Sequence, residues 1–292
     1  MSRLPARAVR RLACLVLGIT LGWSSGIFAD CAGAMAVGSS TRTYVDANRN
    51  NRAVGVRIDY PALNAGSNSE PRRNCNFASL SFGHGFTISA DAYQWLRDAL
   101  VPAQLVLLRP STESGLAPNH LEFARDLNFV QDAIRGDPFF ANVLGPVRIV
   151  GGHSMGGGAA FLAAAERAPS ALIGFAPAET NPSAIAAASQ IQAPVLLLTG
   201  SRDCVTPLAQ HVLPMLAALA STDRTHVDIS GASHCQFSDG SLTCSFGENS
   251  CAGGATISAL AQQQRVRDIL LPWLAQRLGN VLFRSGFEAG RK

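Results

Sequence analysis

Short apolar runs recur along the chain, separated by segments in which apolar residues have helical spacing. The runs, bounded by Gly, Pro, Asn or Ser, predict buried β-strands at 53–60, 77–82, 103–108, 147–150, 171–175, 195–198 and 225–229. Apolar residues three to four positions apart predict helices at 89–100, 120–135, 155–167 and 257–278. Ser89 is the candidate N-cap of the first of these helices.

Strands that alternate with helices predict one α/β domain, with a mostly parallel central sheet and helices on both faces. The runs at 77–82 and 195–198 are apolar almost throughout, as expected for parallel strands buried on both sides. Residues 177–194, between two predicted strands, are too few for a large cap domain, so we expect an open site. The domain is expected over 37–279, followed by a tail at 280–292 that shows no pattern of its own.

The run at 147–150 leads into Gly152-His-Ser154-Met-Gly156 and then an alanine-rich helix. G-x-S-x-G between a strand and a helix is typical of a nucleophile elbow, a sharp turn that presents one serine hydroxyl at the edge of a sheet. The glycines permit a strained serine backbone and a close approach of helix to strand. Ser154 is therefore the candidate nucleophile of a serine hydrolase.

A serine hydroxyl needs an imidazole to take its proton, and the imidazole needs a carboxylate to fix its tautomer. After a nucleophile elbow these residues follow in the order acid, then histidine, each just past a later strand. Asp203 follows the run at 195–198 and His234 follows the run at 225–229, which makes them the candidate acid and base. Glu179, one strand earlier, is the alternative acid. The other histidines are assigned structural roles: His84, His120, His153, His211 and His226.

Such a site also needs two N–H donors that bind an oxyanion. The amide of Met155, directly after the nucleophile, is one candidate. The other belongs in a loop after an early strand, and Gly83-His-Gly-Phe86 fits that loop because glycine lets the backbone turn an amide towards the site. We assign the second donor to Phe86, with Gly85 and Thr87 as alternatives.

The first residues of the chain are basic and then apolar. Four arginines and no acidic residue occur in residues 1–29, and a short apolar run and small residues follow the arginines. This order predicts a secretory signal peptide that ends after Ala29 or, alternatively, after Ala36. The apolar run is short for the alternative, an uncleaved membrane anchor. We therefore expect a secreted or periplasmic protein.

Composition narrows the function further. The chain is 47% apolar and has a net charge of +4. The four arginines of the predicted signal peptide account for this charge, because the remaining basic residues and the acidic residues number 20 each. A neutral domain gives no reason to expect nucleic acid as a partner, and we expect an ester substrate and a monomer. The only lysine, Lys292, excludes Schiff-base chemistry within the fold. No cofactor and no metal are expected, because C-x-x-C and H-E-x-x-H spacings are missing from the sequence.

The cysteines beyond the leader are even in number, which favours disulfides in an exported protein. They are Cys31, Cys75, Cys204, Cys235, Cys244 and Cys251. Spacing alone does not choose among the possible pairings. We hypothesise a Cys204–Cys235 bridge, because each of these residues directly follows a candidate site residue. Cys244–Cys251 would then close a small polar loop, and Cys31–Cys75 would pin the N-terminal segment.

Over residues 50–278 the chain resembles the α/β-hydrolase superfamily. The stretch Gly152-His-Ser-Met-Gly-Gly-Gly158 is similar to the elbow of bacterial cutinases and polyester hydrolases and, more broadly, of dienelactone-hydrolase-like and chlorophyllase-like esterases. Gly231-Ala-Ser-His234 resembles the cutinase histidine loop. The resemblance implies a triad of Ser154, Asp203 and His234, with the oxyanion held by the Phe86 and Met155 amides. In some polyester hydrolases a disulfide links the acid and histidine loops.

The chain departs from that resemblance at one place. Cutinase-like polyesterases carry a tryptophan after the strand that follows the elbow helix, where it forms an aromatic wall. Here the corresponding stretch is Phe175-Ala-Pro-Ala-Glu179. The resemblance therefore does not by itself extend to aromatic polyesters.

Together these patterns predict a secreted, single-domain serine esterase of the esterase, lipase or cutinase kind. Two alternatives use the same fold. One is an acyltransferase in which an alcohol replaces water in the second step, and the other is a catalytically silent binding protein. A complete set of serine, aspartate and histidine argues against the silent protein.

Overall fold

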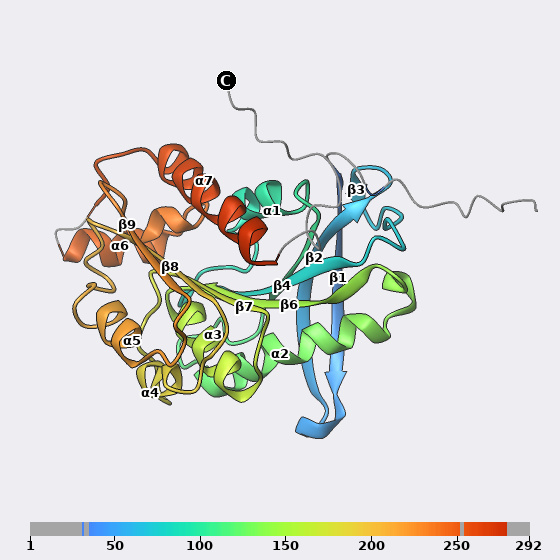
Figure 1. Ribbon diagram of the computed structural model, residues 1–292, viewed down its shortest axis with the longest axis horizontal. Coiled ribbons are helices and arrows are strands. Elements are labelled where there is room, and N and C mark those ends of the chain that lie inside the picture. The colour runs from blue at the N-terminus through green and yellow to red at the C-terminus, as the bar shows by residue number, and fades with distance from the viewer. Residues whose placement is uncertain (1–30, 32–34, 252–253, 279–292) are drawn as a thin grey trace, which may run out of the picture.

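The computed structural model describes residues 31, 35–251 and 254–278 and contains one mixed sheet between layers of helices (Figure 1). The predicted leader 1–29 and the tail 280–292 lie outside the described residues. The strands are β1 (Ala36–Asp46), β2 (Arg52–Ala62), β3 (Gly66–Ser67), β4 (Phe77–Gly83), β5 (Leu105–Pro110), β6 (Leu144–His153), β7 (Ala171–Phe175), β8 (Val195–Gly200) and β9 (Arg224–Ile229). The helices are α1 (Gln94–Leu100), α2 (His120–Gly136), α3 (Met155–Glu166), α4 (Ala184–Ala188), α5 (Val212–Ala218), α6 (Leu242–Ser250) and α7 (Ala259–Leu278), with short 3-10 turns η1 (Ala47–Arg49), η2 (Pro138–Phe140) and η3 (Cys235–Phe237).

The strand order in the sheet is β3-β1-β2-β5-β4-β6-β7-β8-β9. Strands β4 to β9 pair in parallel, whereas β2 is antiparallel to both β1 and β5. The carboxyl ends of the parallel strands therefore meet at one edge, where the turns after β4, β6, β8 and β9 lie close together. The predicted α/β class and the mostly parallel sheet are confirmed.

Helices cover both faces of the sheet, as predicted. Helices α1 and α7 pack on one face, and α2, α3, α4 and α5 pack on the other (Figure 1). Strand β8 shows why its sequence is apolar throughout: Val195 and Leu197 pack against α3 to α5, while Leu196 and Leu198 pack under α7. Between β7 and β8 the described chain carries only α4, so no large cap domain lies there.

Strand β1, which pairs with β2 in a hairpin, was not predicted from the sequence. Strand β1 pairs with β2 over its full length, from Ala36 to Asp46, yet its residues are mainly Ser, Thr, Gly and Arg. Its burial is only partial and alternates along the strand, because it lies near the edge of the sheet. A strand of this kind has too few apolar residues to be recognised by hydrophobic periodicity.

Helix α1 begins later than predicted. Ser89 does not cap it; its hydroxyl accepts a hydrogen bond from Asp91 N inside a separate turn. The helix begins at Gln94, whose amide donates to the Asp239 carboxylate from a distant part of the chain. Tyr93, which precedes the helix, makes no cap bond with its side chain. A long-range contact therefore sets the start of this helix.

A buried ion pair ties the antiparallel part of the sheet to the loop that follows β4. Asp59 on β2 is 0% exposed and Arg109 on β5 is 1% exposed, and a guanidinium nitrogen of Arg109 bonds to Asp59 Oδ2. Ser39 donates to the other oxygen of this carboxylate. Arg109 also donates to Ala90 O at 2.9 Å. A carboxylate at this depth is tolerated only because each oxygen has a partner.

We predict that Arg109→Met will lower the free energy of unfolding by about 3 kcal/mol, because it leaves the buried Asp59 carboxylate with only Ser39 and the more distant, partly exposed Arg57, 3.8 Å away. The double variant Asp59→Leu/Arg109→Met should recover most of that loss. Urea unfolding followed by tryptophan fluorescence measures both changes. Arg97→Met, which breaks the half-exposed pair with Asp98, is the control and should cost less than about 1 kcal/mol. A loss in Arg109→Met no larger than in this control would contradict the prediction.

Candidate active site

Ser154 forms the turn between β6 and α3. Its backbone has φ 56° and ψ −122°, a positive φ that a non-glycine residue adopts only under strain of about 1–3 kcal/mol. Three hydrogen bonds hold this turn: Ser154 N donates to Phe175 O, while Gly158 N and Ala178 N donate to Ser154 O, at 2.9–3.1 Å. Ser154 is largely buried, with 8% of its surface exposed. This is the geometry of the predicted nucleophile elbow.

Glycines allow the backbone segments around Ser154 to approach one another closely. A Cβ on Gly156 would lie 2.2 Å from the carbonyl carbon of Gly83, at the end of β4. A Cβ on Gly152 would lie 2.2 Å from Gly156 O. No side chain fits at either position, so the first turn of α3 rests directly on the end of β4. This contact places the loop that follows Gly83 beside Ser154.

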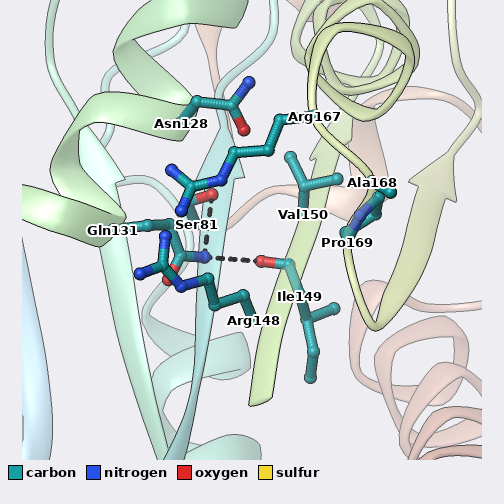
Figure 2. Close-up of a pocket in the computed structure, with 9 residues that line it drawn as sticks. All are labelled: Ser81, Asn128, Gln131, Arg148, Ile149, Val150, Arg167, Ala168 and Pro169. Carbon is teal, nitrogen blue, oxygen red and sulfur yellow. Dashed lines mark hydrogen bonds between the residues drawn. The ribbon is translucent and has the colours of Figure 1, made fainter. Parts of the chain in front are cut away.

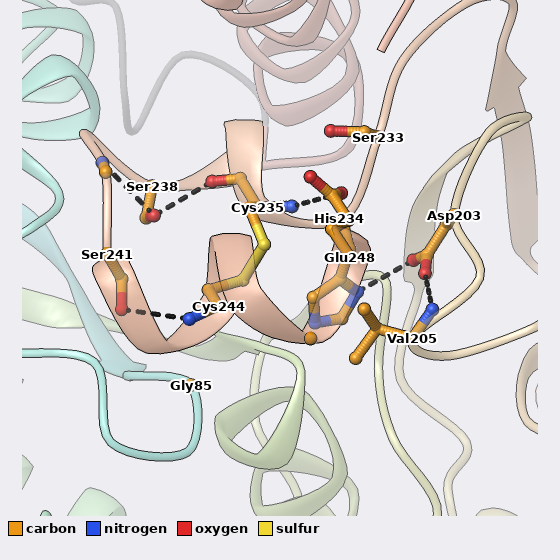
Figure 3. Close-up of a disulfide and its surroundings, with 12 residues drawn as sticks. Gly85, Asp203, Val205, Ser233, His234, Cys235, Ser238, Ser241, Cys244 and Glu248 are labelled. Carbon is orange, nitrogen blue, oxygen red and sulfur yellow. Dashed lines mark hydrogen bonds and ion pairs between the residues drawn. A yellow bond between two sulfur atoms is a disulfide. The ribbon is translucent and has the colours of Figure 1, made fainter. Parts of the chain in front are cut away.

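Asp203 and His234 meet at the same edge of the sheet. Asp203 follows β8, His234 follows β9, and His234 Nδ1 lies 2.7 Å from Asp203 Oδ2 (Figure 3). Their side chains are 3% and 2% exposed. The short distance and the burial indicate a strong hydrogen bond that fixes the orientation of the imidazole.

Thr206, a residue not predicted from the sequence, fixes the other side of this pair. The amides of Val205 and Thr206 both donate to Asp203 Oδ1 at 2.9 Å. Thr206 Oγ1 lies 2.8 Å from Asp203 Oδ2 and 3.0 Å from His234 Nδ1. Thr206 Oγ1 also contacts Ala176 O at 3.2 Å, next to the residue that accepts from Ser154 N. The spacing Asp203-x-x-Thr206 is a common local turn and was the only available signal in the sequence.

Ser154 and His234 lie near each other without a direct hydrogen bond. The ring of His153, the residue before Ser154, lies 4.7 Å from the His234 ring between centroids. Within the described part of the chain, no hydrogen bond joins the Ser154 hydroxyl to the His234 imidazole. Such contacts are often long in free enzymes and shorten when substrate binds. The structure therefore brings together Asp203 and His234 as a bonded pair, with Ser154 as a neighbour.

The two predicted oxyanion amides are both available. Met155 is the first residue of α3, where an amide has no partner within its own helix. Phe86 lies in a tight turn that Ile88 N closes by donating to Gly85 O at 3.0 Å. Neither Met155 N nor Phe86 N meets an acceptor among the described residues. Thr87 has φ 55°, which is the conformation that this kind of turn requires at its third residue.

The alternative acid, Glu179, serves another purpose. Its carboxylate accepts from Ile185 N at 2.9 Å, at the first turn of α4. Its backbone amide donates to His211 Nδ1 at 2.9 Å, and burial holds the pKa of His211 below its usual value. No hydrogen bond within the described residues joins Glu179 to His234. Asp203, and not Glu179, is thus the carboxylate that pairs with His234 here.

Comparison with known proteins agrees with this geometry. The model of the PET hydrolase-like family (PETase) matches residues 66–273, which include Ser154, Asp203 and His234. The chain belongs to this family. The family match and the observed sheet together establish the α/β-hydrolase fold that the residues around Ser154 suggested.

Curated relatives of this PET hydrolase-like chain are cutinases and an ester hydrolase. Cutinase est1 of Thermobifida alba is 26% identical over 61% of this chain and 60% of its own length. Cutinase est2 of the same organism is 28% identical over 56% of this chain and 55% of its own. The bis(hydroxyethyl) terephthalate hydrolase of Streptomyces coelicolor is 28% identical over 54% of this chain and 50% of its own. The matches thus span at most about three fifths of the length of these relatives.

Two of the three hypothesised disulfides are wrong. Cys31–Cys75 forms as predicted, but Cys204 pairs with Cys251 and Cys235 pairs with Cys244. The reason is that the segment between Cys244 and Cys251, expected to be a small polar loop, belongs to helix α6. Cys244 and Cys251 lie seven positions apart along this helical segment, about 10 Å at a helical rise of 1.5 Å per residue, too far for a bridge between them.

Helix α6 instead links the two loops that carry Asp203 and His234. Its inner face holds Cys244, bonded to the residue after His234, and Glu248, whose carboxylate accepts from Cys235 N at 2.9 Å (Figure 3). Cys251, just past the helix, is bonded to Cys204. The acid and histidine loops are therefore connected through α6 rather than directly to each other.

A small cavity on the face of the sheet that α2 and α3 cover takes no part in this site. It lies between α2, β4 and β6, and Gln131 crosses it to bond Ser81 Oγ and Ile149 O (Figure 2). Its volume is about 10 Å³, room for one water. None of the predicted site residues lines it. No cluster of three metal-ligating side chains occurs in the described ranges, and no helix there is long and apolar enough to cross a membrane.

We predict that breaking the Cys204–Cys251 bridge will loosen the pairing of Asp203 with His234. Cys204→Ala/Cys251→Ala opens a loop of 47 residues and should cost about 4 kcal/mol of stability. Cys31→Ala/Cys75→Ala opens a loop of 44 residues, so it should cost nearly the same and serves as the matched control. The proton shared by His234 and Asp203 can be followed in ¹H NMR as a far-downfield resonance.

That resonance should broaden or vanish in Cys204→Ala/Cys251→Ala and persist in the control. If both variants keep it, the Cys204–Cys251 bridge is not needed to hold the pair in place.

Proposed function

We propose that this protein is an exported serine hydrolase that cleaves carboxylic esters. The observation that carries the proposal is the buried 2.7 Å bond between His234 Nδ1 and Asp203 Oδ2 beside a strained Ser154. A histidine with a purely structural role does not require a strained serine beside it. Proton transfer from a serine hydroxyl requires the serine and an oriented imidazole together. The membership in the PET hydrolase-like family and the cutinase relatives support the same chemistry.

In the proposed acylation step Ser154 Oγ attacks the ester carbonyl carbon, and His234 Nε2 takes the hydroxyl proton. Asp203 keeps the proton of the imidazole on Nδ1, so that Nε2 faces the serine as a base, and it stabilises the imidazolium that forms. The negative charge that develops on the carbonyl oxygen binds to the Met155 and Phe86 amides. His234 then gives its proton to the leaving alcohol as the C–O bond breaks.

In the proposed deacylation step water attacks the acyl-enzyme. His234 takes a proton from the water, a second tetrahedral intermediate forms in the same oxyanion site, and Ser154 leaves with that proton. The acid product then departs. No group besides these residues and water is needed for the atoms and charges to balance.

The substrate part of the proposal is limited to carboxylic esters. A cutinase relative and a terephthalate ester hydrolase relative make both aliphatic and aromatic esters candidates. The loop after β7, residues 176–179, has no tryptophan to form the aromatic wall of cutinase-like polyesterases. In this loop the amide of Ala178 donates to Ser154 O. Export completes the proposal and is supported by the three disulfides and by the basic and apolar N-terminal pattern.

We predict that Ser154→Ala will lower kcat for p-nitrophenyl esters by at least about 10³-fold, because no other hydroxyl replaces the nucleophile. Asp203→Asn should lower kcat by about 10⁴-fold through the wrong imidazole tautomer, whereas Glu179→Gln should leave it nearly unchanged. A series from acetate to palmitate, measured beside these variants, gives the chain-length preference.

Ser221→Ala is the control, since Ser221 is buried and donates only to Asp223 O. Turnover that survives Ser154→Ala would refute the hydrolase proposal. Equal losses in Glu179→Gln and Asp203→Asn would refute the assignment of the acid.

A further inference from the structure

The side chain of Tyr93 lies between the two backbone segments that form the candidate site. Its hydroxyl accepts from Gly85 N at 2.9 Å and lies 3.0 Å from His153 Nδ1. Gly85 directly precedes Phe86, and His153 directly precedes Ser154. Tyr93 is 0% exposed and packs against Phe82, with ring centroids 5.1 Å apart. One buried hydroxyl thus bridges the oxyanion turn and the nucleophile elbow.

The positions of the protons follow from counting donors and acceptors. Gly85 N is a donor, so Tyr93 Oη accepts from it and has its own proton to give. If that proton goes to His153 Nδ1, the imidazole carries its proton on Nε2. This Nε2–H makes no close hydrogen bond, although the backbone of His234 lies near the His153 ring. If His153 instead protonates Nδ1, both the tyrosine proton and the Nε2 lone pair are left buried and unpaired. The first arrangement has fewer unpaired groups and is favoured.

This arrangement bears on the Phe86 amide. The hydrogen bond from Gly85 N to Tyr93 Oη points the Gly85 amide into the core. The turn closed by Ile88 N then leaves Phe86 N, the next amide, without an acceptor among the described residues. Arg109 holds the far end of the same loop through Ala90 O. A donor for a developing oxyanion must be fixed before the reaction, because any reorientation during the reaction costs free energy. His84 also holds this turn, with Nδ1 2.9 Å from Gly85 O, but Tyr93 is the buried side chain that joins the turn to the residue before Ser154.

The same hydroxyl bears on the histidine base. The His153 ring lies 4.7 Å from the His234 ring between centroids. An imidazolium at His153 would oppose the protonation of His234 that the reaction needs. Burial holds the pKa of His153 well below its usual value, and a hydrogen bond from Tyr93 to Nδ1 occupies the lone pair that a second proton would take. His153 therefore remains a neutral neighbour.

We propose that Tyr93 is a positioning residue of this esterase: through Gly85 N it orients the Phe86 amide towards the oxyanion, and through Nδ1 it keeps His153 in one neutral tautomer. The proposal rests on the proposed hydrolase function. Tyr93 does not touch the substrate, so it should affect the transition state and leave substrate binding alone.

The test compares tyrosine to phenylalanine changes at two buried sites. Tyr60, like Tyr93, is 0% exposed, and its hydroxyl donates to Ser69 O at 2.8 Å, far from the candidate site along β2. For Tyr93→Phe we expect kcat for p-nitrophenyl butyrate to fall about 10- to 100-fold with KM within about twofold, less than for the loss of a donor itself. The affinity for a trifluoromethyl ketone analogue, which forms an oxyanion, should fall in parallel. For Tyr60→Phe both quantities should stay within about twofold, although thermal stability falls in both variants.

Equal kcat values in Tyr93→Phe and Tyr60→Phe, or a change in KM alone, would overturn the positioning role. Ser154→Ala in the same assay distinguishes failure of the hydrolase proposal from failure of the proposed role of Tyr93. Turnover that does not depend on Ser154 refutes the hydrolase function itself. Turnover that depends on Ser154 but not on Tyr93 refutes only the role of Tyr93.

A measurement on the unaltered protein guards against a variant that fails to fold. With ¹⁵N-labelled histidine, two-bond ¹H–¹⁵N spectra report which ring nitrogen carries the proton. The proposal requires His153 to carry it on Nε2 and to remain neutral from about pH 8 to about pH 5.5. A proton on Nδ1, or titration of His153 near pH 6.5, would overturn the proposal without any substitution.

Discussion

The contact between Gly83 and Gly156 is the constraint on which the site depends. The end of β4 and the first turn of α3 touch backbone to backbone, at a separation that no Cβ could share. This contact fixes where the Gly83–Ile88 loop runs relative to Ser154. It also forces the sharp turn at Ser154, whose positive φ is stabilised by bonds to Phe175 and Ala178. The strain at one residue is thus offset by the packing of three segments around it.

The rest of the site is built on loops, and each loop is held by a contact that lies outside the sheet. The β8 and β9 loops are joined through α6 by two disulfides and the Glu248 carboxylate. Asp203 is further held by the amides that follow it and by Thr206. On the opposite side, Tyr93 and Arg109 fix the loop after β4 from within the core. Rigid loops of this kind suit a site whose donors must be in place before charge develops.

The sequence predicted the parts of the fold that follow from burial. Parallel strands such as β8 are apolar throughout because both faces are covered, and the amphipathic helix α2 shows its period plainly.

Strand β1 and helix α6 were missed because their residues are mostly polar and they are held by pairing partners and disulfides rather than by burial. The pairing of the cysteines failed for the same reason, since it depended on knowing that 244–251 is helical. The sequence placed Ser154, Asp203 and His234 at one edge of the sheet because strand ends, which burial does predict, mark their places. The contact of Thr206 with His234 is tertiary, and its only signal in the sequence is the common local spacing Asp203-x-x-Thr206. Tyr93 acts through tertiary contacts that no local pattern encodes.

The central claim is that Ser154 is the nucleophile activated by His234 and Asp203. Treatment of the folded protein with a fluorophosphonate, followed by peptide mapping, tests it most directly, because only an activated serine reacts rapidly with this probe. The account predicts one adduct per chain, on Ser154, and its loss in His234→Ala although Ser154 is still present. An adduct on another residue, or equally fast labelling of Ser154 without His234, would contradict the account.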